Sequence, residues 1–257
     1  MPRKLNEINM KANIFPQSLI VFVIWTTVTA VVGAWMTGGN ATLDELVKDG
    51  VMWSALLAGL IVVGAVYFLR VKEETGITPL ASNATWVPVI VQGVVIALLL
   101  FKGLILTPSF SGGQIFWILL NTLFVGISEE MMFRGLLFSG LYKRYSYWVA
   151  CLGVAVLFGL VHVLNGFITG DFVSGLLQAG LVAFSGLLFM AMRLGMGSII
   201  PVIIMHWLWD FSIFINPPEG VGEGIGLIVG LIAVVSPPLF GIIGLIVIGR
   251  LRKRIEG

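Results

Sequence analysis

Eight long runs of apolar residues decide what this chain can fold into. At 1.5 Å per residue, each run is about long enough for a helix that crosses a hydrocarbon core of about 30 Å. The runs cover residues 18–36, 51–69, 86–107, 114–142, 147–165, 174–192, 198–215 and 224–249. Because backbone groups in lipid must be hydrogen-bonded within the protein, each run is predicted to be a helix. The sequence thus predicts an all-α, polytopic membrane helix bundle of about eight transmembrane helices, as a single integral membrane domain over residues 1–257.

The composition agrees with a membrane protein and excludes other classes. Hydrophobic residues make up 58% of the 257 residues and charged residues only 11%, which lies outside the range of soluble globular domains. The net charge of +2 is too small to indicate nucleic-acid binding. The single cysteine, Cys151, cannot form an intrachain disulfide and is expected to be a buried thiol. Small size and short loops favour a multi-pass protein of a prokaryotic plasma membrane, with the lipid bilayer as its surroundings.

The positive residues fall almost entirely on one side of the predicted bundle. If the N-terminus is cytoplasmic, all but one of the cations outside the apolar runs lie on the cytoplasmic side. They are Arg3, Lys4, Lys11, Arg70, Lys72, Lys143, Arg144, Arg193, Arg250, Arg252, Lys253 and Arg254, against Lys48 on the outer side. We therefore predict that both termini are cytoplasmic. Lys102, near the outer end of its run, is expected to extend its ammonium group to the interface.

Two of the runs differ from a simple straight span. Pro237 and Pro238 stand inside the last run, and because prolines remove helical hydrogen bonds, a kink or an interruption is predicted there. The run 114–142 is longer than a membrane requires, so we expect it to tilt or to extend into the cytoplasm.

A set of titratable side chains lies inside these runs, at depths where ions are costly. The set comprises Glu129, Glu130, Arg134, His162, His206 and Asp210, and so contains both histidines of the protein. A charged group near the bilayer centre costs about 2.5–3.5 kcal/mol on insertion scales, so such groups must face one another or water. Counted along the helices, Glu129, His162, His206 and Asp210 fall at similar depths in the middle of the membrane. We predict that they share one hydrated cavity.

The spacing of these residues groups them in pairs on three helices. The pairs, each separated by four residues, are Glu130 with Arg134, Phe158 with His162, and His206 with Asp210. Residues four apart share a helix face, whereas Glu129 points about 100° away from Glu130. We therefore predict an ion pair between Glu130 and Arg134 that leaves Glu129 available for chemistry.

The three pairs resemble the motifs of a known protein family. Residues 129–134 (EEMMFR) match E-E-x-x-x-R, residues 158–162 (FGLVH) match F-x-x-x-H, and residues 206–210 (HWLWD) match H-x-x-x-N/D. In this order, over a motif-bearing core of about residues 114–215, the chain resembles the CAAX protease and bacteriocin-processing family, which includes the type II CAAX prenyl endopeptidases. The resemblance implies an intramembrane endopeptidase whose partners are membrane-associated peptides or proteins, prenylated ones in cells that prenylate proteins.

The resemblance also implies a role for each residue. Glu129 would be the general base for the attacking water, His162 would hold and polarise that water, and His206 with residue 210 would stabilise the oxyanion. Burial in an apolar site disfavours the charged form of a carboxylate, which independently favours proton uptake by Glu129. The residues that would shape the site are Glu130, Arg134 and Phe158.

Position 210 departs from the prenyl-protease branch, where an amide stands. An ionised Asp210 cannot donate a hydrogen bond to an oxyanion. We expect Asp210 instead to orient His206 or to hold it protonated, with His206 as the principal donor.

The preferred interpretation requires no cofactor, and a zinc enzyme is its enzymatic alternative. Imidazole and carboxylate groups suit zinc, which would then be bound by His162, His206 and Glu129. The sequence contains no H-E-x-x-H or H-x-x-E-H motif and only two histidines. An aspartyl protease fits less well, because it needs two membrane aspartates.

Two interpretations without catalysis remain open. An ion-coupled or proton-coupled carrier would use buried carboxylates and histidines as a relay, although no internal repeat is evident. A catalytically inactive immunity protein would keep the same motifs without turnover.

Overall fold

The computed structural model describes residues 14–39, 41–216 and 225–256, and within these ranges it contains helices and no strand. The long helices are α1 (Phe15–Thr37), α3 (Trp53–Phe68), α4 (Val87–Phe101), α5 (Gly112–Glu130), α7 (Tyr147–Val161), α9 (Phe172–Met196), α10 (Ile200–Phe214) and α11 (Ile225–Glu256). The short elements are α2 (Leu43–Lys48), α6 (Phe138–Arg144), α8 (Gly166–Thr169), the π-helical segments η2 (Lys102–Leu106) and η3 (Met131–Leu137), and the 3-10 turn η4 (His162–Asn165). The all-α class is confirmed.

The predicted membrane bundle is also confirmed, with one difference in helix length. Among the described residues, 6 helical stretches are long and apolar enough to cross a membrane. They are Phe15–Thr37, Val87–Leu106, Gly112–Arg144, Tyr147–Thr169, Phe172–Met196 and Gly230–Lys253. The two remaining predicted spans correspond to α3 and α10, which have 16 and 15 residues and are shorter than their apolar runs.

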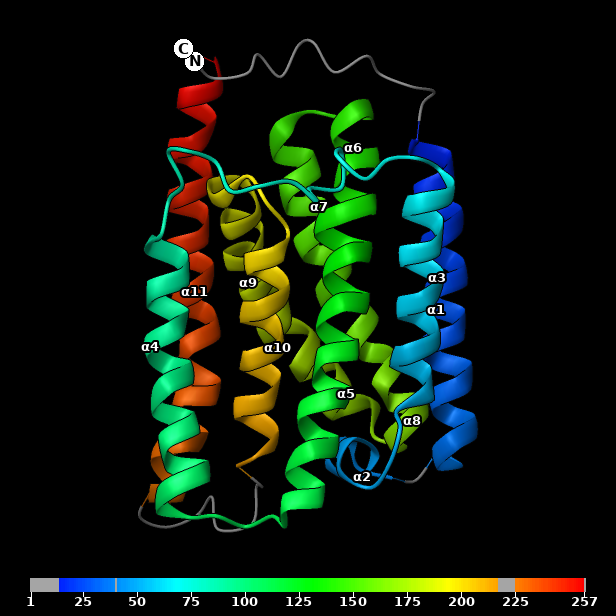
Figure 1. Ribbon diagram of the computed structural model, residues 1–257, viewed down its shortest axis with the longest axis vertical. Coiled ribbons are helices and arrows are strands. Elements are labelled where there is room, and N and C mark those ends of the chain that lie inside the picture. Colours follow the sequence, from blue (N-terminus) through cyan, green and yellow to red (C-terminus); the bar gives the residue numbers. More distant parts are fainter. Residues whose placement is uncertain (1–13, 40, 217–224, 257) are drawn as a thin grey trace.

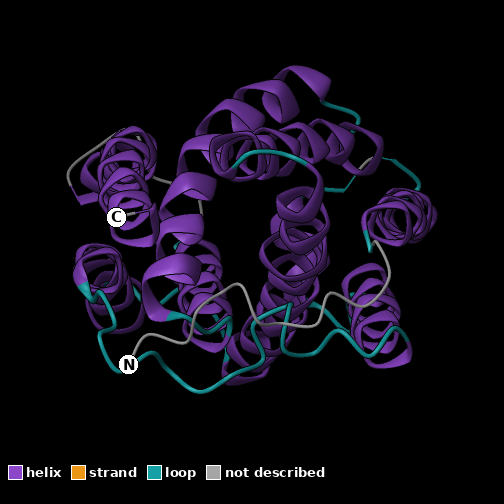
Figure 2. Ribbon diagram, turned by 90° about the horizontal axis from the view of Figure 1, so that it is seen from above, coloured by secondary structure: helices purple, strands orange, loops and turns teal. Residues whose placement is uncertain are grey.

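The helices run along the long axis of the molecule, and Figure 2 shows most of them end-on. α9 packs against α7 and α11, while α5 packs against α10 and α3. Cys151 of α7 is fully buried in this core, as expected. α1 begins and α11 ends at the same end of the bundle, opposite α2 and α8 (Figure 1).

Most of the described cations gather at the end where α1 begins and α11 ends, which we call the basic end. They are Arg70, Lys72, Lys143, Arg144, Arg193, Arg250, Arg252 and Lys253. Lys48 lies in α2 at the opposite end, which we call the α2–α8 end. Arg3, Lys4 and Lys11, and the side chain of Arg254, lie outside the described residues. The described cations are thus separated as the sequence indicates, and a cytoplasmic location of the basic end stays a prediction.

The last helix decides between the two outcomes expected at its prolines only in part. α11 continues through Pro237 and Pro238 without an interruption, and a kink there stays a prediction. The two prolines remove backbone donors, but such losses are tolerated in membrane helices that neighbouring helices support. α11 packs along α9 over a long contact, and this support keeps the helix continuous.

The stretch from Gly112 to Arg144 carries a feature that the sequence did not reveal. It extends to the basic end, and its tilt or extension into the cytoplasm stays a prediction. Its middle, however, is π-helical over Met131–Leu137, directly after the two adjacent glutamates. Short π-helical segments inside α-helices occur frequently at functional sites.

Asn121 of α5 anchors the α2–α8 end. Its amide nitrogen donates to the carbonyl oxygens of Val47 at 2.9 Å and Gly50 at 2.6 Å, and its carbonyl oxygen accepts from the backbone nitrogen of Met52 at 2.9 Å. The side chain is fully buried. One residue therefore fixes the connection between α1 and α3 to the bundle, since it pairs three backbone groups that would otherwise lack partners.

Replacing Asn121 by Ala should destabilise the protein by about 2–3 kcal/mol, because buried backbone groups lose their hydrogen bonds. The measurement is the thermal unfolding midpoint in detergent, which should fall relative to wild type. Asn83→Ala, at an exposed loop position, is the matched control and should leave the midpoint unchanged. Equal midpoints for the two variants would contradict the anchoring role.

Candidate active site

The predicted site lies where α5 and α10 approach closely. A Cβ atom at Gly126 would lie only 3.1 Å from the backbone nitrogen of Trp207, so a larger residue would force the helices apart. Trp207 also donates from Nε1 to the carbonyl oxygen of Leu119 at 2.8 Å. These contacts bring the histidine and the aspartate of α10 next to the two glutamates of α5.

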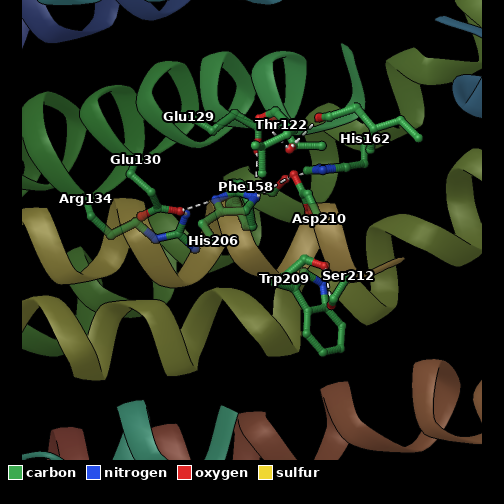
Figure 3. A network of polar contacts seen from close by, with 12 residues as sticks. Thr122, Glu129, Glu130, Arg134, Phe158, His162, His206, Trp209, Asp210 and Ser212 are labelled. Carbon is green, nitrogen blue, oxygen red and sulfur yellow. Dashed lines mark hydrogen bonds and ion pairs between the residues drawn. The ribbon is translucent and has the colours of Figure 1, made fainter. Parts of the chain in front are cut away.

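Glu130 is bonded to two buried side chains at once (Figure 3). Arg134 donates from Nη1 to Glu130 Oε1 at 2.9 Å, which is the predicted ion pair. The same oxygen lies 2.6 Å from His206 Nδ1. A carboxylate oxygen only accepts hydrogen bonds, so Nδ1 of His206 carries a proton. Glu130 therefore orients His206 in addition to pairing with Arg134. The sequence predicted only the pair with Arg134.

The guanidinium group of Arg134 is enclosed by rings and a carbonyl group. Its central carbon lies 3.9 Å from the ring centroid of Phe158 and 5.2 Å from that of Phe189. Its Nη2 donates to the carbonyl oxygen of Gly186 at 3.2 Å, and a Cβ at Gly186 would lie 3.0 Å from that nitrogen. Phe158 thus contacts the cation directly, a cation–π arrangement that stabilises a charge removed from water.

The second ring nitrogen of His206 faces the other two carboxylates. Nε2 lies 3.4 Å from Asp210 Oδ2 and 3.7 Å from Glu129 Oε2. The expected contact between Asp210 and His206 is therefore present, but the shorter contact comes from Glu130. The ring of His206 also stacks on Phe189, with centroids 4.8 Å apart. Three carboxylates and one aromatic face thus hold this imidazole in place.

His162 is oriented by the backbone of its own helix. It ends α7 and begins η4, and its Nδ1 lies 2.7 Å from the carbonyl oxygen of Phe158. Because a carbonyl oxygen accepts, Nδ1 carries the proton and Nε2 of the neutral ring is an acceptor. The four-residue spacing of Phe158 and His162 therefore sets both the position and the tautomer of the histidine.

The four residues predicted to be catalytic line one cavity of about 190 Å³, as the depth argument predicts. They are Glu129, His162, His206 and Asp210. The remaining wall is largely apolar and includes Trp25, Val125, Val182, Phe189, Trp209 and Phe214. A cavity with a few convergent polar groups in an apolar wall is typical of a binding site.

A second, smaller cavity adjoins the first at Glu129 and His162. Its volume is about 30 Å³, which is enough room for a water. It lies between α1 and the segment from Val161 to Ile168, and Glu129 and His162 belong to its wall. The Oε2 atom of Glu129 is buried without a hydrogen-bond partner among the described residues. A carboxylate side chain and an imidazole thus adjoin a space that can hold a water.

Sequence reasoning missed several uncharged polar residues of these cavities. Asn165 lines both cavities and donates from Nδ2 to Gln178 Oε1 at 2.9 Å. Trp25 of α1 donates from Nε1 to Ser128 Oγ at 2.8 Å. The available signal was the presence of amide and hydroxyl side chains inside apolar runs, where unpaired polar groups are costly.

The zinc alternative stays a prediction about the same residues. Within the described ranges, no group of three or more His, Cys, Asp or Glu side chains is placed to hold a metal ion. The Nδ1 atoms of both histidines are engaged, by Glu130 and by the backbone of Phe158, so Nε2 is the ring nitrogen that each histidine could offer to a ligand.

A comparison with protein families agrees with the motifs. Residues 111–212 match the family described as type II CAAX prenyl endopeptidase Rce1-like, a range that contains all seven residues of the predicted site. The match confirms the family resemblance and indicates a protease of the CAAX type in a multi-pass membrane protein. No curated protein and no solved structure matches the chain.

Replacing Arg134 by Met should destabilise the protein by about 3–5 kcal/mol, because Glu130 would keep a buried charge without its cation. The measurement is the unfolding midpoint in detergent or in a denaturing-detergent titration. The double variant Glu130→Gln with Arg134→Met removes both charges and should regain part of the loss. A single variant as stable as wild type would show that the pair is not a buried ion pair.

Proposed function

We propose that this protein is an intramembrane endopeptidase that hydrolyses peptide bonds of membrane-associated substrates with a water activated by Glu129. The observation that carries the proposal is the position of Glu129 in the walls of both cavities, with no hydrogen-bond partner for Oε2 among the described residues. One cavity has the size of a water, and the other has room for part of a substrate. General-base hydrolysis requires a proton acceptor that contacts the attacking water next to the bound substrate.

The proposed reaction moves one proton through Glu129. The carboxylate takes a proton from the water while the water oxygen attacks the carbonyl carbon of the scissile bond. The electron pair of the C=O double bond moves to the carbonyl oxygen, which becomes the oxyanion of a tetrahedral intermediate. When the C–N bond breaks, its electron pair goes to nitrogen, and Glu129 returns the proton to the leaving amine. The products are a new carboxylate end and a new amine end.

His206 is the proposed oxyanion donor. Its Nδ1–H is bound by Glu130, so its Nε2 is the nitrogen that faces the cavity side of the ring. A proton on Nε2 would be stabilised by Asp210 at 3.4 Å and by Glu129 at 3.7 Å. Loss of one oxyanion donor typically costs about 10²–10³-fold in kcat.

The substrate cavity extends toward the α2–α8 end. Its wall includes Leu43, Val47 and Met52 around α2. Toward the basic end, the helix after the glutamates is sealed in the core, with relative exposures of 0% at Met132, Phe133, Arg134, Leu136 and Leu137. We therefore propose that an apolar substrate segment enters from the α2–α8 end.

This direction of entry suggests a substrate class. If the basic end is cytoplasmic, as the positive residues predict, the entrance lies in the outer half of the membrane. The proposed substrates are then peptides or proteins anchored in the plasma membrane, with the scissile bond near its outer side. A prenylated chain would have to present its C-terminus from that side.

Replacing Glu129 by Gln should lower kcat by at least about 10²-fold, because the amide cannot accept the proton of the water. The assay uses purified protein in lipid vesicles with a library of labelled, membrane-anchored peptides. His162→Ala should reduce cleavage in the same assay. Glu73→Gln, at an exposed loop position, is the control with wild-type activity.

The same assay separates the alternatives. Cleavage retained by both Glu129→Gln and His162→Ala would refute glutamate catalysis. Loss of wild-type cleavage in a chelator, with recovery on adding zinc, would support the metalloprotease. Ion flux across the vesicle membrane without cleavage would support the carrier, and neither activity would support an immunity protein.

Labelling of introduced cysteines should reveal the side of entry without a known substrate. In a Cys151→Ala background, a membrane-impermeant maleimide added to intact cells should label Phe214→Cys in the cavity wall. Arg144→Cys at the basic end should react only in inside-out vesicles. The reverse pattern would show that the cavity opens to the cytoplasm and would overturn the proposed substrate class.

A further inference from the structure

Thr26 of α1 has an unpaired hydroxyl group next to the proposed water site. The helix contains three other threonines, and each donates to the carbonyl oxygen four residues earlier: Thr27 at 2.8 Å, Thr29 at 2.8 Å and Thr37 at 3.1 Å. This back-bonding is the usual way in which a helix satisfies a threonine hydroxyl. Thr26 does not use it, and its Oγ1 is buried without a hydrogen-bond partner among the described residues.

The location of Thr26 explains where that hydroxyl group could find a partner. Thr26 belongs to the wall of the 30 Å³ cavity, together with Glu129 and His162. The register between the helices is set by the preceding residue on each, because Trp25 donates to Ser128 at 2.8 Å. Thr26 and Glu129 therefore follow directly on two residues that are hydrogen-bonded to each other.

A water bound between Glu129 and His162 would lack a hydrogen-bond donor to its oxygen. The carboxylate of Glu129 is an acceptor, and Nε2 of neutral His162 is an acceptor because Nδ1 donates to the carbonyl oxygen of Phe158. A water that donates its two protons to these groups has two lone pairs left. One lone pair must point at the substrate carbonyl, and the other is available to a donor. A hydroxyl group supplies that donor, since it can rotate its hydrogen toward the water.

We propose that Thr26 donates a hydrogen bond from Oγ1 to the attacking water and so completes the catalytic site. The proposal rests on the proposed function and extends it to a residue of α1, outside the family match over residues 111–212. Glu129 and His162 hold the two protons of the water, and Thr26 holds one lone pair. The remaining lone pair is directed at the scissile carbonyl, which is the orientation that attack requires.

Thr26→Val tests the proposal, because valine keeps the shape of threonine and lacks the hydroxyl group. In the vesicle assay with a peptide that wild type cleaves, kcat should fall by about 10-fold to 100-fold with KM nearly unchanged, since only positioning of the water is lost. Thr26→Ser keeps the hydroxyl group and should retain most of the wild-type kcat. Thr27→Val removes a hydroxyl that is bonded to its own helix and is the matched control with wild-type kcat.

The outcomes distinguish this proposal from the general one. Wild-type kcat in Thr26→Val, while Glu129→Gln is inactive, would overturn the role of Thr26 and leave glutamate catalysis intact. An equal loss in Thr26→Val and Thr26→Ser would also overturn it, because the loss would then follow from packing. If Thr26→Val does not fold, as judged by its unfolding midpoint, Thr26→Ala replaces it with the same expected fall in kcat and rescue by serine.

Discussion

The arrangement of the site depends on one buried carboxylate. Glu130 is fully buried and its Oε1 atom contacts both Arg134 and His206, at 2.9 Å and 2.6 Å. Removing a carboxylate and a guanidinium from water is costly, and the cost is offset only when each charge has a close partner and further hydrogen bonds. Arg134 obtains these from Glu130, from Gly186 and from the ring of Phe158. The contacts of this cluster therefore join four helices, α5, α7, α9 and α10.

The groups that are available for chemistry lie beside this cluster. Glu129 precedes Glu130 on the same helix and faces away from the arginine, and its Oε2 has no hydrogen-bond partner among the described residues. The two adjacent glutamates thus perform different tasks because a helix turns about 100° per residue. The carboxylate of Glu130 is bonded within the core. The carboxylate of Glu129 lines the cavity together with both histidines. The π-helical segment that begins at Met131 forms the part of the helix that is sealed in the core, directly after the part that lines the site.

Much of the site followed from the sequence because charges in lipid are so strongly constrained. The residues Glu129, His162, His206 and Asp210 stood out as titratable groups in apolar runs, and the four-residue spacings assigned them to shared helix faces. Their meeting in one cavity is observed, whereas their catalytic roles stay predictions. The helix boundaries also agreed closely with the apolar runs. Of the kink or interruption expected at the prolines of α11, the interruption does not occur, and the helix packs along α9.

The sequence by itself determined that the chain is a helical membrane bundle with a few buried ions that must meet, since hydrophobic length and the cost of burying charge act on each segment separately. Only the tertiary structure decided which partners they meet. Glu130 rather than Asp210 makes the shorter bond to His206, and Thr26 reaches the site across more than a hundred residues of sequence. Contacts between helices depend on close approaches such as that of Gly126 to Trp207. The residue pattern of one helix does not specify how a neighbouring helix is rotated about its own axis.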